Sequence, residues 1–125
     1  MRVIQFALGG PDDVHWPHNY VPNTVAYTGT HDNETVNGWF AGLNEHDRHY
    51  PGLTLGHYIG DPAWELIRMA WASVAVVAVA PLQDVLSLGN EARMNTPGVA
   101  EGNWRWRFRL DQFRPEVIDR VRDFT

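Results

Sequence analysis

The sequence of 125 residues contains neither cysteine nor lysine. Without cysteine, the chain cannot be a disulfide-stabilised scaffold, and it cannot hold a metal through thiolates. All ten basic residues are arginines, and fifteen acidic residues bring the net charge to -5. Nucleic-acid binders need a basic face, so this balance argues against that class of partner.

Long apolar runs are also missing. The longest, Val74 to Leu82, is too short to cross a bilayer, which takes about 20 residues. Met1 to Gly10 hold one arginine and a short apolar run, too little for a signal peptide. We therefore expect a cytoplasmic chain with no membrane partner.

Three short apolar runs predict β-strands: Val3–Leu8, Thr24–Thr28 and Val74–Val79. They alternate little between apolar and polar residues, which is typical of parallel strands covered on both faces. The third run could equally be the end of a helix, because its periodicity fits both.

Three helices are expected. One starts at Pro62, with Asp61 as its N-cap and with Glu65 and Arg68 three apart on its outer side. A second is predicted from Val36 to about His49. A third begins near Pro115 and carries an apolar stripe of Val117, Ile118 and Val121.

This alternation of strands and helices predicts a parallel α/β fold. Three parallel strands cannot close a barrel, and a complete (β/α)8 barrel takes about 250 residues. The simplest interpretation is that residues 1–125 form part of one barrel domain. Long loops rich in glycine and proline, at Gly9–Pro22 and Gly89–Gly102, are candidate places for a site.

The first candidate site follows the second predicted strand. His31 and Asp32 lie at its carboxyl end, which is the catalytic side of a barrel. A carboxylate there can accept hydrogen bonds from sugar hydroxyls and oppose positive charge at an anomeric carbon. The alternative is that Asp32 or Asn33 only caps the helix that begins near Glu34.

A second polar cluster follows the third strand. It holds Gln83, Asp84, Glu91, Arg93 and Asn95, side chains suited to orienting a ligand with many hydroxyls. The alternative is structural, with an ion pair between Glu91 and Arg93 and with Asp84 capping a short turn.

A third motif, Trp104 to Arg109, alternates aromatic residues with arginines. Such a motif can bind single-stranded nucleic acid, but core packing of Trp104 and Trp106 with the arginines in solvent fits the acidic chain better. Two histidine pairs, His15/His18 and His46/His49, raise the question of a metal site. A zinc site usually needs three or four converging ligands, whereas the first pair lies by Pro17 in a loop and the second on a polar stretch, so no metal is expected.

Six segments together resemble the C-terminal part of the 4-α-glucanotransferase (amylomaltase) family. They occur in the family's order and cover nearly all of the chain: Val3–Phe6, Pro17–Tyr20, Tyr27–Asn33, Pro81–Leu86, Glu91–Gly98 and Gly102–Arg107. The resemblance implies that residues 1–125 are a partial catalytic domain, supplying roughly strands six to eight of a (β/α)8 barrel. Ser87 departs from the pattern, since the family usually has glycine there.

The resemblance also implies roles for three residues. Asp32 matches the third catalytic carboxylate, His31 a neighbour that binds the same sugar, and Asn95 an asparagine that contacts the glucan. The nucleophilic aspartate and the acid/base glutamate would lie on earlier strands, so the chain alone is expected to be inactive without that part of the barrel. The expected ligands are maltooligosaccharides or α-1,4-glucan, with no cofactor.

Two other functions stay open from sequence. One is a carbohydrate-binding module that uses tryptophans and the His31/Asp32 pair without turnover. The other is a single-stranded nucleic-acid binder that uses Trp104 to Arg109.

Overall fold

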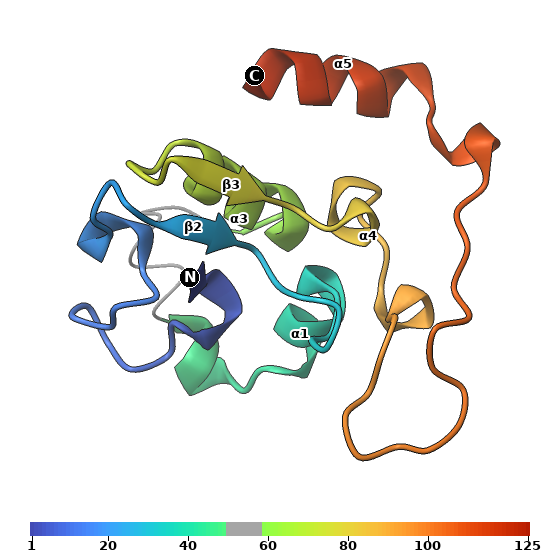
Figure 1. The fold of residues 1–125 in the computed structure, drawn as a ribbon, viewed down its shortest axis with the longest axis horizontal. Coiled ribbons are helices and arrows are strands. Elements are labelled where there is room, and N and C mark those ends of the chain that lie inside the picture. The colour runs from blue at the N-terminus through green and yellow to red at the C-terminus, as the bar shows by residue number, and fades with distance from the viewer. Residues whose placement is uncertain (50–58) are drawn as a thin grey trace.

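A three-stranded parallel sheet organises the computed structural model, which describes residues 1–49 and 59–125 (Figure 1). The strands are β1 (Arg2–Val3), β2 (Val25–Tyr27) and β3 (Val77–Val79), in the spatial order β1-β2-β3. The neighbouring pairs are parallel, with Val3 opposite Tyr27 and Tyr27 opposite Val79. The predicted parallel α/β arrangement is confirmed.

The first strand is shorter than predicted. After Val3 the chain turns into a 3-10 helix, Ile4–Phe6, which is closed by a hydrogen bond from the Ala7 N–H to the Ile4 carbonyl at 2.9 Å. The Val3 N–H donates to His15 Nδ1 at 3.1 Å, and the turn lets Gln5 Nε2 donate to the Glu34 carbonyl at 3.0 Å. The expectation of a strand through Leu8 is therefore wrong.

The third apolar run is a strand and not a helix, but only its last three residues pair with β2. Val74 and Val76, which precede β3, are exposed. The predicted strand Val74–Val79 is thus too long at its start.

The helix predicted from Val36 to His49 is interrupted. Helix α1 (Val36–Gly42) ends where Leu43 turns extended, and residues 45–49 are helical again. Asn44 separates the two pieces, and its Oδ1 accepts a hydrogen bond from the Asp47 N–H at 2.8 Å. An N-cap within a predicted helix was the missed signal.

The other helices are α3 (Pro62–Trp71), α4 (Leu82–Val85) and α5 (Pro115–Phe124). Short 3-10 turns lie at Pro17–Asn19, Asn90–Ala92 and Leu110–Gln112. Asp61 occupies the N-cap position of α3, but its carboxylate pairs with Arg120 at 2.8 Å and does not cap the helix. None of the helices within the described ranges is long and apolar enough to span a membrane.

Helix α3 covers one face of the sheet. Its buried side chains include Ala63, Leu66 and Ala70, which share a core with Ala26 of β2. Small alanines at the contact let the helix approach the strands closely. Helix α3 also contacts α1 and α4, so it fixes the loops that follow β2 and β3.

The opposite face of the sheet is open at β3. Val77 and Val79 of β3 alternate with the half-buried Ala78 and are 48% and 38% exposed. A parallel strand normally has both faces covered. This uncovered apolar surface is what an incomplete barrel is expected to show.

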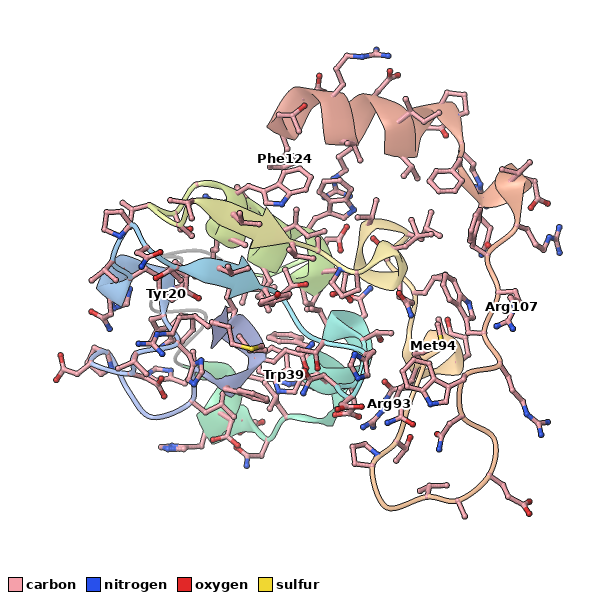
Figure 2. The ribbon with its side chains drawn as sticks, viewed as in Figure 1. Tyr20, Trp39, Arg93, Met94, Arg107 and Phe124 are labelled. Carbon is pink, nitrogen blue, oxygen red and sulfur yellow. The ribbon has the colours of Figure 1, made fainter. Side chains whose placement is uncertain are left out.

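Helix α5 lies apart from the sheet, beyond a long excursion of the chain that follows α4 (Figure 1). It reaches the body through Phe124, which packs on Trp64 with ring centroids 5.2 Å apart, and through Arg120, 4.5 Å above the same indole (Figure 2). Val117 and Val121 are half-buried as the predicted stripe requires, but Ile118 is exposed.

Candidate active site

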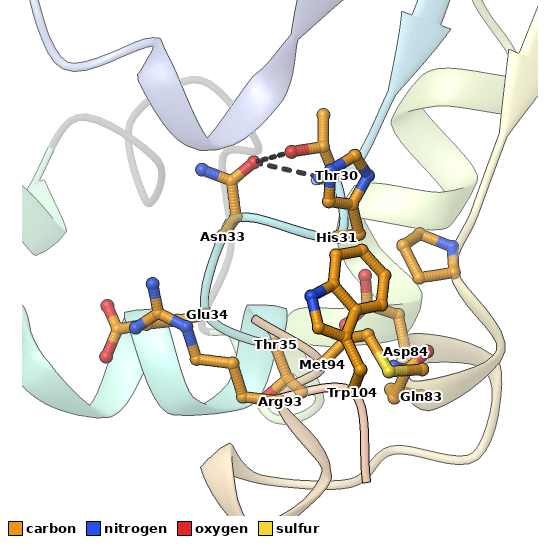
Figure 3. Close-up of a pocket in the computed structure, with 11 residues that line it drawn as sticks. Thr30, His31, Asn33, Glu34, Thr35, Gln83, Asp84, Arg93, Met94 and Trp104 are labelled. Atoms are coloured by element: carbon orange, nitrogen blue, oxygen red, sulfur yellow. Dashed lines mark hydrogen bonds between the residues drawn. The ribbon is translucent and has the colours of Figure 1, made fainter. Parts of the chain in front are cut away.

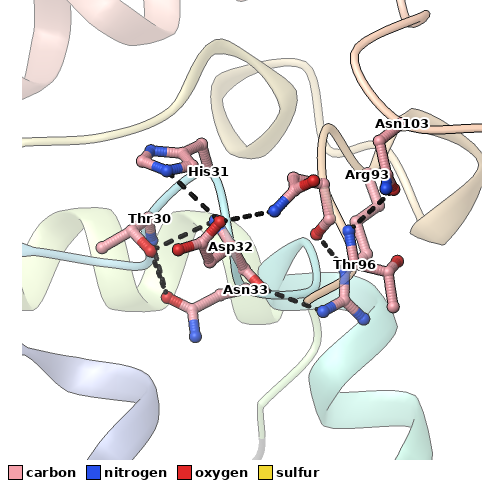
Figure 4. A network of polar contacts seen from close by, with 8 residues as sticks. Thr30, His31, Asp32, Asn33, Arg93, Thr96 and Asn103 are labelled. Carbon is pink, nitrogen blue, oxygen red and sulfur yellow. Dashed lines mark hydrogen bonds and ion pairs between the residues drawn. The ribbon is translucent and has the colours of Figure 1, made fainter. Parts of the chain in front are cut away.

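The segment after β2 forms a tight turn that presents two side chains to solvent. Asn33 Oδ1 accepts hydrogen bonds from the backbone N–H and the hydroxyl of Thr30, at 2.8 and 2.9 Å (Figure 4). An asparagine side chain that bonds nearby backbone in this way stabilises a turn. His31 and Asp32 lie at its tip and are exposed.

Asp32 does not cap the following helix. The N-cap of α1 is Thr35, whose hydroxyl accepts a hydrogen bond from the Gly38 N–H at 3.2 Å. The capping interpretation of Asp32 and Asn33 is therefore wrong, and the Asp32 side chain is left for another use.

The three sequence-predicted site residues meet at one carboxylate oxygen. Asn95 Nδ2 donates to Asp32 Oδ1 at 2.7 Å, and His31 Nε2 lies 3.2 Å from the same oxygen (Figure 4). Within residues 1–49 and 59–125, no hydrogen bond ends on Asp32 Oδ2, and the side chain is 48% exposed. One carboxylate oxygen is thus held by the protein and the other faces solvent.

The backbones of the two loops are joined beneath these side chains. The Asn95 N–H donates to the His31 carbonyl at 3.1 Å. Arg93 Nη2 donates to the Asp32 carbonyl at 2.8 Å, and Arg93 Nε donates to the Asn95 carbonyl at 2.9 Å. The guanidinium therefore spans the loops and does not form the ion pair with Glu91 considered from sequence.

Asp84 is a buried support for the site. It is 1% exposed, and its carboxylate accepts hydrogen bonds from the Thr28 hydroxyl and the Val36 N–H, both at 2.8 Å. It joins the end of β2 to the first turn of α1, so it caps a remote helix and not the local turn. Burial raises the pKa of the Asp84 carboxyl, and the two hydrogen bonds oppose the rise.

Trp104 lies against His31 and is not part of the core. Its ring centroid is 5.2 Å from that of His31, and the residue is 54% exposed, so the expectation of core packing is wrong. Its φ of 61° is strained for a tryptophan. The backbone N–H donates to the Met94 carbonyl at 2.7 Å. The Gly102–Asn103 dipeptide was the sequence signal for this turn.

A hollow of about 200 Å³ lies beside this tryptophan (Figure 3). Apolar and polar groups alternate around it, among them His31, Gln83, Met94 and Trp104. A mixed lining of this kind suits a ligand with flat apolar faces and hydroxyl edges, such as a sugar ring.

His15 and His18 are both engaged with backbone groups. His15 Nδ1 accepts from the Val3 N–H, and His18 Nε2 lies 2.8 Å from the Pro11 carbonyl. Across the described part of the chain, no three His, Cys, Asp or Glu side chains are grouped to hold a metal ion.

Comparison with known proteins gives one family. A family profile described as 4-alpha-glucanotransferase matches residues 1–111. The 4-alpha-glucanotransferase of Clostridium butyricum is 40% identical over 128 residues, covering 100% of this chain and 26% of the relative. That of Synechocystis is 46% identical over 121 residues, covering 90% and 23%.

A solved structure agrees with the sequence comparison. The chain is similar to the amylomaltase from Streptococcus agalactiae in complex with acarbose, with a TM-score of 0.93 and 31% identity over 100% of this chain and 26% of that one. The chain spans about a quarter of the length of the relatives it matches. It belongs to the 4-alpha-glucanotransferase family.

Proposed function

We propose that residues 1–125 supply the third carboxylate of a 4-α-glucanotransferase, as the last part of its (β/α)8 barrel, roughly strands six to eight. The observation that carries this is the geometry at Asp32. Its Oδ1 is held by Asn95 and His31, while its Oδ2 faces solvent at the carboxyl ends of parallel strands. Family membership and the likeness to an amylomaltase in complex with acarbose support the assignment.

In this function Asp32 accepts hydrogen bonds from the 2- and 3-hydroxyls of the donor sugar. As the glycosidic bond breaks, positive charge builds at the anomeric carbon and the bonds to the 2-hydroxyl strengthen. An ionised carboxylate accepts such bonds more strongly than a neutral amide. His31 and Asn95 orient the carboxylate and contact the same sugar.

The rest of the reaction belongs to other parts of the barrel. Transfer with retention needs a nucleophilic carboxylate and an acid/base carboxyl about 5–5.5 Å apart. Neither is assigned to the present chain, so residues 1–125 alone do not cleave or transfer α-1,4-glucan. The ligands are maltooligosaccharides, and no cofactor takes part.

The test uses a full-length hybrid, in which residues 1–125 replace the matching segment of the Synechocystis relative. Glucose release and chain redistribution from maltotriose are measured for the chain alone, the hybrid and the hybrid with Asp32→Asn. We expect activity only in the unchanged hybrid. Asp32→Asn keeps the shape of the side chain and removes its charge, so kcat falls by a factor on the order of 10² or more.

Three outcomes contradict the proposal. Turnover by residues 1–125 alone overturns the assignment of the nucleophile and acid/base to the remainder of the barrel. A fully active Asp32→Asn hybrid removes the catalytic role of Asp32. If the chain binds maltooligosaccharide but its hybrid never transfers, the non-catalytic binding module replaces the enzyme. The exposed Trp104 beside His31 is the feature that such a module would use.

A further inference from the structure

Arg93 occupies the junction between the two loops that carry the site. Arg93 is half-buried, and its side chain lies between the turn after β2 and the segment that leads to Asn95 (Figures 2 and 4). Within the described part of the chain, its guanidinium donates to two main-chain carbonyls, those of Asp32 and Asn95. These are the two residues whose side chains meet at 2.7 Å.

This arrangement separates two tasks. The Asn95 amide sets the contact between side chains, whereas the guanidinium sets the distance between the backbones that carry them. Because Arg93 binds main-chain carbonyls, it takes up neither oxygen of the Asp32 carboxylate, and Oδ2 stays open to hydroxyl donors. A partner arginine on the carboxylate itself would compete with the sugar.

The geometry needs an arginine. The guanidinium is planar and rigid, and its Nε and Nη2 donors point in fixed directions toward two acceptors. A lysine ammonium is a single point on a flexible stem, and it cannot hold two carbonyls at a fixed separation from this position.

We propose that Arg93 is a positioning residue for glucan transfer: it fixes Asp32 and Asn95 relative to each other through their main-chain carbonyls. The inference rests on the proposed function, because the site it serves is the one formed by Asp32. Misplacement of a positioned group by about 1 Å can cost 10²-fold in rate, so the effect of losing Arg93 falls on kcat. Ground-state binding, which many other contacts share, changes little.

The experiment compares variants of the full-length hybrid: Arg93→Lys, Arg93→Ala, Asn95→Ala and the double variant Arg93→Ala/Asn95→Ala. Arg122→Lys is the matched control, since Arg122 is exposed on α5 and pairs with Asp119 of the same helix at 3.0 Å. For each variant, kcat and KM for maltotriose and the melting temperature are measured. Arg93→Ala is also assayed with millimolar guanidinium and, separately, with sodium chloride at equal ionic strength.

We expect Arg93→Ala to lower kcat by about 10- to 100-fold with KM changed by less than about threefold, and Arg93→Lys to follow in the same direction. Guanidinium restores part of the lost kcat and sodium chloride does not. Because both residues act through one carboxylate, the loss caused by Arg93→Ala is smaller in the Asn95→Ala background. Arg122→Lys keeps the kcat of the unchanged hybrid.

The inference is overturned if Arg93→Lys keeps the full kcat, or if Arg93→Ala and Asn95→Ala act additively and guanidinium rescues nothing. If Arg93→Ala does not fold, the kcat of Arg93→Lys tests the role of Arg93 instead. If the unchanged hybrid is active and the Arg93 variants keep its full kcat, the inference about Arg93 is wrong but the proposed function stands. An unchanged hybrid that folds but transfers no glucan defeats the proposed function, and the inference with it.

Discussion

At the scale of single residues, Asp84 shows how a buried carboxyl group can hold a site together. Its two acceptor oxygens serve the Thr28 hydroxyl and the Val36 N–H. We expect Asp84→Ala to destabilise the full-length hybrid by about 1–3 kcal/mol, because the Val36 N–H then stays buried without an acceptor. Asp84→Asn should cost less, since its oxygen can accept from Val36 and its amide can donate to the Thr28 oxygen. Urea unfolding of the three proteins checks this order.

The same residue predicts a dependence of stability on pH. Burial raises the pKa of Asp84 in the folded chain, so the folded state binds this proton more tightly than the unfolded state does. The stabilisation due to the proton is complete below the ordinary carboxyl pKa and is lost as the pH rises through the raised value. The stability of the unchanged hybrid relative to Asp84→Asn should therefore fall from about pH 4 upward. A difference that stays constant or grows over that range contradicts the burial argument.

Ser87 is a second residue whose effect on stability can be measured, here through its backbone conformation. Its φ of 55° lies in the left-handed region, directly after the C-cap of α4. The Ser87 N–H donates to the Asp84 carbonyl and the Leu88 N–H to the Gln83 carbonyl, a Schellman arrangement that favours glycine. We expect Ser87→Gly to raise the stability of the hybrid by about 1 kcal/mol. Ser87→Ala keeps the Cβ and is the control, and equal stabilisation by both variants would exclude backbone strain as the cause.

Some contacts of the site could be predicted from the sequence and others could not. The meeting of His31, Asp32 and Asn95 followed from their places after parallel strands, and the structure confirms it. The parts played by Arg93 and Asp84 were missed, because their partners include main-chain atoms far along the chain. Because nearly every residue carries a main-chain carbonyl and N–H group, no residue type or spacing in the sequence marks such contacts.

At the scale of elements, local patterns predicted what local interactions decide. Pro62 and the apolar spacing after it gave α3 correctly. The strand expected over Val3–Leu8 ends at Val3, where a 3-10 turn begins and brings the Gln5 side chain to the Glu34 carbonyl, a partner distant in sequence. The apolar pattern predicted burial correctly for Val3, Ile4 and Ala7 but not for Phe6, which is 52% exposed. Burial alone does not distinguish a strand from a 3-10 turn.

The contact between α1 and the turn Asn90–Ala92 depends on a glycine. A Cβ on Gly38 would overlap the side chain of Asn90, whose Nδ2 donates to Glu34 at 2.8 Å. Alanine normally stabilises a helix relative to glycine, yet we expect Gly38→Ala to lower the melting temperature of the hybrid. Gly42→Ala, in the same helix with open space around its Cβ, is the control and should not lower it. The double variant Gly38→Ala/Asn90→Ala removes the Asn90 side chain and should recover part of the lost melting temperature. If it recovers none, the alanine at position 38 clashes with another group.

At the scale of the whole molecule, the open face of the sheet dominates the behaviour expected of residues 1–125 alone. Val77 and Val79 are 48% and 38% exposed, and β3 is an unprotected sheet edge next to the exposed Val74 and Val76. Such edges and apolar surfaces favour association between copies. In the proposed barrel, the missing strands and side chains cover both.

We therefore expect the isolated chain to form oligomers, to bind an apolar fluorescent dye and to unfold without a sharp transition, whereas the full-length hybrid does none of these. Size-exclusion chromatography with light scattering, dye fluorescence and thermal unfolding measure the three properties. Replacing Val77 and Val79 by threonine in the isolated chain should reduce association, because it removes apolar surface while keeping β-branched side chains suited to a strand. The same replacements in the hybrid should lower its melting temperature, since in the closed barrel these positions face apolar neighbours. A monomeric, cooperatively unfolding chain that binds no dye would show that the open face is stable in water, and the partial-barrel interpretation would then lose its physical basis.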